Sequence, residues 1–446
     1  RLLKRRTMKL SGRGNYPRVE VRVLGARGTA ETVAVIDREA SLIPRGNGRA
    51  YGDSALNRNA TLSMRPSDRM LAFDAGSGLL ACEAGVMLAD IIEVFLPRGW
   101  FVPVTPGTKF VTLGGMIAAD VHGKNHHRAG SICSHIADLQ LALADGQVVR
   151  CSADENADLF FATVGGMGLT GVILSASIRL IRIETAFIRQ ETRRARDLAE
   201  VMELFETSDS WTYSAAWIDC LARGNQAGRS LLYLGEHARI GELPAGLASE
   251  LKTAYRQHRR VPIDFPAFAL NRWSVRAFNE LYYRRGKPGS AFVGYDGYFY
   301  PLDAILQWNR IYGRPGFVQY QCVLPKAASQ VGVMALLNRI ARSGEGSFLA
   351  VLKLFGPGNR GMLSFPQEGY TLALDFRASS GTFSLLTELD AVVADHGGRL
   401  YLAKDARMGA GMLAQGYPQL EAFRQLKRRI DPAGKFSSLQ SQRLGL

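Results

Sequence analysis

The sequence predicts an α+β protein of two domains, and three observations support this prediction. With 446 residues, the chain is too long for one ordinary hydrophobic core. Strand-like and helix-like stretches alternate along it without the repeated β-α crossover pattern of a parallel sheet. After residue 183, glycine-rich loops give way to charged connectors and aromatic-rich strands. We expect a first domain of residues 1–185, to which the tail 401–446 returns, and a second domain of residues 186–400.

Hydrophobic periodicity places the elements of the first domain. Alternating apolar and polar residues indicate a strand, whereas apolar residues three and four apart indicate a helix. Pro97-Arg98-Gly99 ends one helix, and Asp145-Gly146 forms the turn of a hairpin. The expected strands span 19–23, 71–73, 79–83, 136–149 (as the hairpin) and 172–183, and the expected helices span 31–40, 88–96 and 158–164.

The second domain shows the same two periods and is followed by a basic helix in the tail. The expected strands lie within 211–234 and at 318–324, 347–354 and 371–376, and the expected helices span 198–205, 327–343, 382–395 and 422–430. Between residues 255 and 301, basic and aromatic residues follow one another without a clear period. Regular structure is hard to place there, and a long loop in a compact protein is usually functional or disordered.

The composition indicates which kind of binding partner and which cellular compartment to expect. The chain has 55 Lys and Arg against 40 Asp and Glu, which favours an anionic partner such as nucleic acid, a lipid surface or a phosphorylated substrate. Its five cysteines are odd in number and not closely paired, which indicates reduced, buried thiols. No apolar run reaches about 18 residues, and the charged stretch 1–6 precedes no apolar segment. We expect no transmembrane helix or secretory signal, and a protein that is cytoplasmic or peripheral at the inner membrane.

Two glycine-rich loops suggest a binding site. One runs from Pro44 to Asp53, and the other from Pro106 through Gly114-Gly115 to His127. Glycine lets backbone N–H groups approach a ligand closely, and successive N–H groups form a concave nest for an anion such as a pyrophosphate. A Gly-Gly pair alone is more often a tight turn between core elements. Two such loops separated by strand-like sequence favour a phosphate-bearing cofactor, with the second domain as a cap over it.

Other motif classes fit the sequence less well. Gly166–Gly171 matches G-x-G-x-x-G, but a helix precedes it and a strand follows, the reverse of the dinucleotide-binding order. A metal site at His122, His126 and His127 would need a helix, which Gly123 disfavours, and no acidic or cysteine ligand is close in sequence. The chain has neither a G-x-S-x-G elbow nor a P-loop. Nucleic-acid binding by the basic segment would leave the glycine loops unexplained.

A second candidate group lies near the end of the chain. Tyr401 and Lys404 follow the last expected helix of the second domain, in the stretch Gly397–Asp405. A lone lysine is usually solvated, but beside a cofactor these two side chains suit substrate orientation and deprotonation. Lysine can stabilise a developing alkoxide, or it can act as a base when burial lowers its pKa. Both roles stay open at this point.

These loops, together with Ala162–Gly171, resemble those of FAD-dependent oxidases of the vanillyl-alcohol-oxidase (PCMH-type) superfamily. Within it the chain is similar to the decaprenylphosphoryl-β-D-ribose 2-oxidase family, over most of its length and least before residue 18 and between 225 and 290. The stretches that carry this resemblance are Arg49–Asp53, Pro106–His127, Tyr213–Trp217, Gly316–Gln321, Lys353–Pro357 and Tyr401–Asp405.

The resemblance implies an FAD-binding domain of two α+β subdomains with a substrate (cap) domain built on an antiparallel sheet. It also implies which residues hold the cofactor. The first glycine loop would bind the FAD pyrophosphate, and residues from three later segments would complete the contacts. The implied FAD-binding residues are Arg45, Gly46, Asn47, Gly48, Arg49, Ala50, Tyr51, Gly52, Asp53, Ser54, Gly107, Thr112, Gly114, Gly115, Ala119, His122, Ile173 and Tyr401.

The resemblance further implies a reaction and its partners. Lys124, Gln321, Lys353 and Lys404 match substrate-pocket positions, and Lys404, His122 and Tyr401 match the positions nearest to turnover. The family oxidises C2 of a lipid-phosphoryl ribose to a 2-keto sugar, passing a hydride to the flavin. A separate NAD(P)H-dependent reductase then yields the arabinose epimer.

Two departures modify these expectations. Some members of the superfamily attach FAD covalently through a His in the first glycine loop, but no His occurs at 44–54, so we expect non-covalent FAD. Mycobacterial members carry a Cys where this chain has Ala373, which therefore cannot be a thiol target. A different lipid or sugar is compatible with this difference.

Two alternative functions and two interpretations of the basic segment stay open. A sugar-alcohol or aldonolactone oxidase of the same superfamily would accept free polyols. A basic membrane- or nucleic-acid-binding protein with a degenerate cofactor site would bind no FAD. The basic, aromatic segment 255–287 suits peripheral contact with anionic lipid headgroups, and the alternative is a disordered surface loop.

Overall fold

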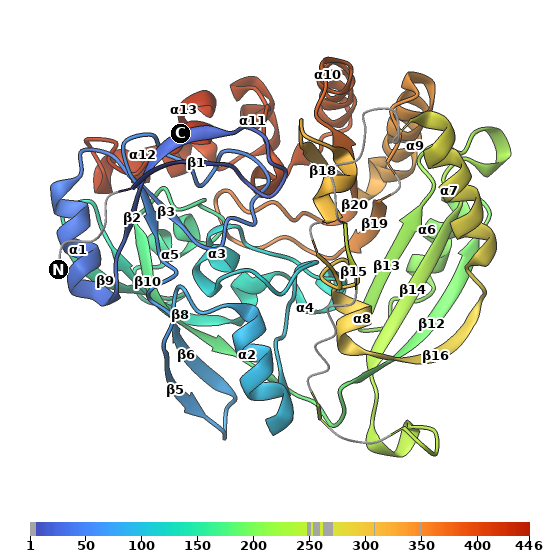
Figure 1. Ribbon diagram of the computed structural model, residues 1–446, viewed down its shortest axis with the longest axis horizontal. Coiled ribbons are helices and arrows are strands. Elements are labelled where there is room, and N and C mark those ends of the chain that lie inside the picture. The colour runs from blue at the N-terminus through green and yellow to red at the C-terminus, as the bar shows by residue number, and fades with distance from the viewer. Residues whose placement is uncertain (1–5, 248–250, 253–258, 262–270, 307, 348) are drawn as a thin grey trace.

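The computed structural model describes residues 6–247, 251–252, 259–261, 271–306, 308–347 and 349–446. Its first half contains two sheets and its second half one large sheet (Figure 1). The first sheet has the order β1-β2-β4-β3, with β1 and β2 antiparallel and the other pairs parallel. Helix α1 (Gly28–Arg38) follows β2. The strands are β1 (Arg6–Leu10), β2 (Val19–Gly25), β3 (Ile43–Arg45) and β4 (Thr61–Ser63).

The second sheet is antiparallel and has the order β5-β6-β10-β8-β9. Its core is formed with α2, α3 and α5, and β7 pairs with β11 beside it. The strands are β5 (Met70–Asp74), β6 (Leu79–Glu83), β7 (Trp100–Phe101), β8 (Ile136–Ala142), β9 (Val148–Cys151), β10 (Val172–Arg179) and β11 (Ile181–Arg182). The helices are α2 (Leu88–Phe95), α3 (Leu113–Ala118), α4 (His126–Ala129) and α5 (Ala157–Thr163).

The third sheet has eight strands in the order β16-β12-β14-β13-β19-β20-β18-β21, all paired antiparallel. Helices α6 (Leu198–Glu206), α9 (Lys326–Ser343) and α10 (Ser380–Asp395) share a core with it. The strands are β12 (Phe187–Ala195), β13 (Tyr213–Ile218), β14 (Ser230–His237), β16 (Gly289–Gly294), β18 (Phe317–Pro325), β19 (Ala350–Phe355), β20 (Gly369–Arg377) and β21 (Arg399–Leu400).

The two faces of this sheet differ because successive side chains of a strand point in opposite directions. On β20, Leu372 and Leu374 belong to the core shared with the helices. Thr371, Ala373 and Asp375 therefore lie on the opposite face. Across the neighbouring strands, the residues in register with them are Gln319, Gln321, Val323, Val351 and Lys353. One face of the sheet is thus apolar and covered by helices, and the other carries several polar residues, among them Lys353 and Asp375.

The C-terminal segment returns to the first sheet. Helices α11 (Ala410–Gly416), α12 (Leu420–Ile430) and α13 (Leu439–Leu444) lie next to the N-terminal strands in Figure 1. The backbone N–H of Leu42 donates to the carbonyl of Lys435 at 2.9 Å. The buried Lys427 ammonium donates to the carbonyl oxygens of Leu169 and Phe436 and pairs with Asp431.

Most expected elements are present, and the largest error concerns residues 255–301. The described part of this segment contains α7 (Arg272–Arg285), β16 and α8 (Tyr295–Phe299), so the hypothesis of a disordered loop is wrong there. Helix α7 begins at Asn271, whose side chain accepts from the N–H groups of Trp273 and Ser274. It buries only Val275 and Asn279, too narrow a face for hydrophobic periodicity to reveal. Residues 255–258 and 262–270 lie outside the described residues.

Smaller differences concern the ends of elements. Strand β1 was not expected, and the strand expected at 172–183 is divided into β10 and β11. The helix-then-strand order around Gly166–Gly171 is confirmed by α5 and β10. All five cysteines are buried and unpaired, as expected.

Candidate active site

The second glycine loop leads into helix α3. Thr112 caps this helix, because its hydroxyl oxygen accepts from the N–H of Gly115 at 3.2 Å. Gly114 lies against β6, since a Cβ there would lie 2.8 Å from the Cβ of Ala84. A Cβ at Gly107 would meet no atom within 4 Å. Gly114 therefore serves packing, whereas Gly107 leaves open space beside the backbone.

The first glycine loop is tied directly to the second. The Asn47 amide and the Arg49 guanidinium both donate to the carbonyl oxygen of Phe110, at 2.8 and 3.2 Å. A Cβ on Gly46 would lie 2.1 Å from the hydroxyl oxygen of Thr112, so only glycine fits there. Gly48 has φ +64°, which also favours glycine. The two predicted loops therefore lie side by side and form one surface lined by backbone atoms.

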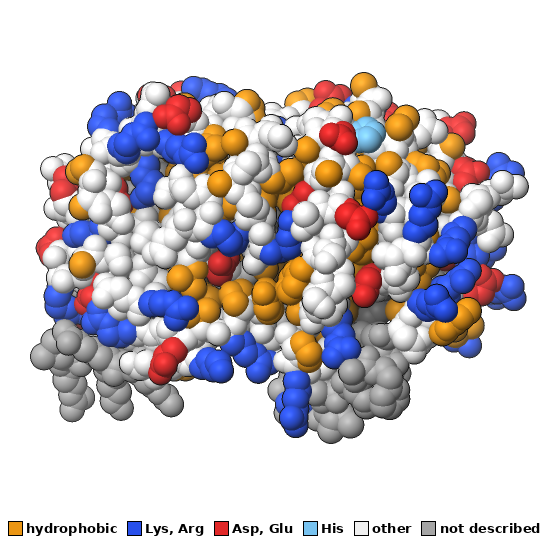
Figure 2. Space-filling model, turned by 90° about the horizontal axis from the view of Figure 1, so that it is seen from above, with side chains coloured by type: hydrophobic (Ala, Val, Ile, Leu, Met, Phe, Trp, Pro, Cys, Tyr) orange, Lys and Arg blue, Asp and Glu red, His pale blue; other side chains and the backbone are white. Residues whose placement is uncertain are grey.

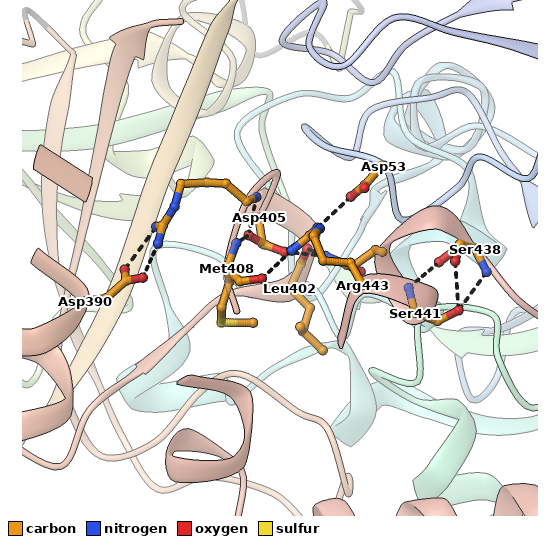
Figure 3. A network of polar contacts seen from close by, with 10 residues as sticks. Asp53, Asp390, Leu402, Asp405, Met408, Ser438, Ser441 and Arg443 are labelled. Carbon is orange, nitrogen blue, oxygen red and sulfur yellow. Dashed lines mark hydrogen bonds and ion pairs between the residues drawn. The ribbon is translucent and has the colours of Figure 1, made fainter. Parts of the chain in front are cut away.

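The end of the first loop is held by the C-terminal segment rather than left free. The N–H of Tyr51 donates to the carbonyl of Ala403 at 2.9 Å, and a Cβ on Gly52 would lie 1.9 Å from the carbonyl oxygen of Asp405. Arg443 of α13 forms ion pairs with Asp53 at 2.8 Å and Asp405 at 3.0 Å (Figure 3). The Asp53 carboxylate is therefore occupied by an internal ion pair.

The remaining predicted residues of the two loops and β10 surround these contacts. Arg45 donates to the Ser11 carbonyl at 2.8 Å, and the Ala50 carbonyl accepts from the N–H of Arg13 at 2.8 Å. Ser54 is buried. Ile173 lies on β10 in the core that also contains residues of α3, so it packs below the helix to which the second loop leads.

His122 lies between the glycine loop and the eight-stranded sheet, and its hydrogen bonds fix its tautomer. The Thr371 hydroxyl donates to the Cys322 carbonyl at 2.8 Å, so it must accept from the Gln321 amide at 3.2 Å. The Gln321 amide nitrogen, a donor only, also contacts the Nε2 of His122 at 3.0 Å. Nε2 is therefore an acceptor, and the neutral ring carries its proton on Nδ1.

The proton on Nδ1 of His122 is a buried donor without a partner among the described residues. Burial, and next the charge of Lys353, hold the pKa of His122 well below its usual value. Aromatic rings surround it, with Phe355 at 4.7 Å and Tyr401 at 5.2 Å between ring centroids. A buried unsatisfied donor normally costs free energy, so this site is suited to an acceptor atom of a ligand.

Tyr401 connects the eight-stranded sheet to the second glycine loop. Its hydroxyl donates to the carbonyl of Ala119 at 2.7 Å, at the end of α3. Its N–H donates to the carbonyl of Gln321 at 3.0 Å, and its ring stacks on Phe365 at 4.6 Å. Burial raises the pKa of Tyr401 well above the usual value, so the phenol stays protonated. Its observed role is to position Ala119, Gln321 and His122.

Three lysines give the site a positive charge. Lys404 lies with its Nζ 4.1 Å from the centroid of the Tyr51 ring, and Lys124 with its Nζ 4.2 Å from that of Tyr298. Burial, with Lys353 as the second cause, lowers the pKa of Lys124 to about 7, and burial lowers that of Lys353 to about 8. The pKa of Lys404 is also lowered by burial, against the opposing effect of Asp375. Lysines whose charge is so weakly solvated favour an anionic ligand.

Sequence reasoning missed the residues that support these lysines and His122. Asp375 is buried and accepts from the Gln319 amide at 2.6 Å, and burial raises its pKa. Phe365 and Thr371 were missed as well. Gln319, Gln321, Thr371 and Asp375 are polar residues two or four positions apart on β18 and β20, a pattern that a search for single motifs does not detect. Ala373 lies on the same face, in register with Gln321.

The three histidines of the second loop do not converge. His126 packs on Phe355 at 4.4 Å, and His127 hydrogen-bonds through its Nε2 to the carbonyl of Trp211 at 2.9 Å. Contrary to expectation, residues 126–129 do form a short helix, α4. Within the described ranges, no three His, Cys, Asp or Glu residues are grouped as metal ligands. None of the described helices combines the length and apolar content needed to cross a bilayer.

Comparison with known proteins assigns this site to a family. Residues 25–152 match the FAD binding domain family. The decaprenylphosphoryl-β-D-ribose oxidase of Mycolicibacterium smegmatis is 38% identical over 99% of this chain and 98% of its own. An uncharacterised Streptomyces coelicolor protein is 38% identical over 81% of this chain and 100% of its own, and the L-gulonolactone oxidase of Bos taurus is 29% identical over 35% of each chain.

The glycine-lined surface, the matched FAD domain and the full-length similarity together confirm an FAD-dependent oxidoreductase with an α+β fold. The chain belongs to the decaprenylphosphoryl-β-D-ribose oxidase family.

Proposed function

We propose that this chain oxidises the C2 hydroxyl of a polyprenylphosphoryl-β-D-ribose to the 2-keto sugar, the first half of an epimerisation to the arabinose donor. The observation that carries this proposal is the group of three lysines, Lys124, Lys353 and Lys404, whose pKa values are lowered by burial, near neutral His122. Such a group suits a substrate that presents both a phosphate and sugar hydroxyls. The named Mycolicibacterium relative acts in this class and is similar over its whole length.

The residues present fit FAD. Backbone at 45–54 and 112–115, with the open space at Gly107, would hold its pyrophosphate, and the unpartnered Nδ1 proton of His122 offers a donor. When bound, FAD supplies the hydride acceptor. We propose that residues 1–185 and 401–446 form this FAD-binding unit and residues 186–400 the cap. Gly114 and Asp53 contribute by packing and ion pairing to the shape of the loops.

The protein's own residues would bind the substrate and take its proton. Lys124 and Lys353 would bind the phosphate. His122 would donate a hydrogen bond rather than act as a base, because its Nε2 already accepts from Gln321. Lys404, with its lowered pKa, would accept the hydroxyl proton as the C2 hydrogen leaves as hydride. A separate NAD(P)H-dependent reductase would then reduce the 2-keto sugar.

The visible spectrum of the purified protein tests this function. We expect a flavin band that bleaches when a prenylphosphoryl ribose is added without oxygen, and that does not bleach with ribitol or xylitol. Bleaching by a free polyol would instead assign the chain to the sugar-alcohol or aldonolactone oxidases. A protein that binds no FAD would contradict both.

We also propose that FAD is bound non-covalently. No His occurs at 44–54, where a covalent link would be expected, and the loop is occupied by its internal hydrogen bonds. Acid precipitation should therefore release essentially all of the yellow colour into the supernatant. Colour that stays with the pellet, and a protein mass raised by that of FAD, would show a covalent link.

Peripheral contact with a membrane through residues 255–287 is the last part of the proposal. A lipid-linked substrate is held in a bilayer, so the enzyme must meet it at a surface. Arg284, Arg285 and Lys287 are exposed in the described part of this segment, and Trp273 lies on the same helix.

A further inference from the structure

Helix α7 packs beside strand β13 of the eight-stranded sheet. Its Tyr282 ring packs 4.8 Å from that of Trp217 on β13, and the Asn279 amide donates to Asp219 at 2.7 Å. Trp217 is in register with Val351, two residues before Lys353 on the neighbouring strand. Because Val351 and Lys353 share a face, the Tyr282 ring of α7 lies on the same side of the sheet as Lys353.

Helix α7 buries few residues on its inward side, and its solvent-exposed side carries apolar residues. Val275 and Asn279 are buried against the sheet. Trp273, Ala277 and Leu281 follow one another at four-residue spacing on the opposite side, and Trp273 is 64% and Leu281 48% exposed. Exposed aromatic and aliphatic side chains that form a stripe indicate an interaction surface.

Basic residues flank this stripe. Helix α7 contains four arginines, at 272, 276, 284 and 285, and a single acidic residue, Glu280. Glu280 is already paired with Arg229 and Arg284. Lys and Arg side chains gather at the end of the molecule that carries α7, on the right in Figures 1 and 2. The flanks of the stripe are therefore positively charged.

We propose that the stripe and arginines of α7 dock the protein on an anionic lipid bilayer, with Trp273 and Leu281 in the interface and Arg276, Arg284 and Arg285 at the headgroups. An apolar stripe bordered by arginines is the pattern of helices that lie in the plane of a membrane surface. Positive flanks would repel a second copy of the same helix, whereas anionic headgroups attract them. The inference rests on the proposed function in one respect, since the bilayer is where the lipid substrate resides.

Vesicle co-sedimentation of the FAD-loaded full chain tests this inference. We expect binding to phosphatidylcholine vesicles that contain 30% phosphatidylglycerol, about 100-fold weaker binding to phosphatidylcholine alone, and release by high salt. Replacing Arg284, Arg285 and Lys287 with Gln should weaken binding to the anionic vesicles by about 100-fold, at about fivefold per charge. W273S/L281S should weaken it by roughly tenfold.

Matched controls lie on other helices. V331S removes an apolar residue that is 69% exposed on α9, and R428Q/R429Q removes two arginines of α12; both should bind as the unmodified protein does. All variants should still bleach with a short-chain, water-soluble prenylphosphoryl ribose, so a failure of the substrate assignment appears separately. Unchanged vesicle binding by the α7 variants, or concentration-dependent self-association that they abolish, would overturn the proposal.

Discussion

Replacing Lys404 with Met should slow reduction of the bound flavin by substrate roughly 10³-fold, the usual contribution of a positioned acid or base. Lys404 is partly buried beside Tyr51, and its pKa is lowered by desolvation. Methionine keeps the length of the side chain but can neither accept a proton nor carry a charge. Stopped-flow absorbance at the flavin band, without oxygen, measures this rate directly, and the FAD content should be unchanged.

The pH dependence of the same rate separates the two roles of Lys404. Because the amine must be neutral to accept a proton, the rate should rise with pH through the lowered pKa and then level off, and K404M should lose this step. Asp375 raises the pKa of Lys404. D375N should therefore move the step to lower pH. A rate that falls as Lys404 loses its proton would show instead that its charge stabilises an alkoxide.

A surface lysine provides the control for this substitution. Lys326 at the start of α9 is paired with Glu206 and is half-exposed, so K326M should leave the rate and its pH profile unchanged. Equal loss of rate in K326M and K404M would assign the effect to general damage rather than to proton transfer.

The glycine loops and Lys404 could be predicted because their chemistry is local in the sequence. Gly46 and Gly48 are recognised by residue type alone, and the structure gives a physical reason for each. Lys404 and Tyr401 lie together in the sequence as they do in the fold. Strands β13, β14, β18, β19 and β20 of the large sheet were also expected, whereas β12 lies where a charged connector was expected and β16 was not predicted.

Features that depend on pairing between distant segments could not be predicted. Asp375 and Gln319 become neighbours only when β18 and β20 pair in one register, and a shift by one residue would place Asp375 among the helices. Helix α7 was missed because it buries only Val275 and Asn279. Asp53 was assigned to cofactor binding alone, since no local signal connects it with Arg443, 390 positions away.

Replacing Arg443 with Met should destabilise the protein by about 3 kcal/mol, the cost of breaking a buried ion pair by removing one partner. Arg443 pairs with Asp53 and Asp405, whose side chains are buried (Figure 3). Asp405 keeps the N–H groups of Arg407 and Met408, whereas Asp53 loses its only ion-pair partner among the described residues. The temperature at which FAD is released, followed by flavin fluorescence, should fall on the order of 5 °C.

The size of this effect should depend on pH. Burial raises the pKa of Asp53 above its usual value, and Arg443 opposes that rise, so R443M should raise the pKa further. An acid with a raised pKa in the folded state destabilises that state when it is ionised. The loss of stability should therefore be largest at neutral pH and shrink as pH falls through the raised pKa. R428M, which breaks the exposed pair with Glu421, should leave the stability almost unchanged at every pH. Equal losses in R443M at neutral and acidic pH would show that packing of α13, rather than the charge of Asp53, holds the first glycine loop to the C-terminal segment.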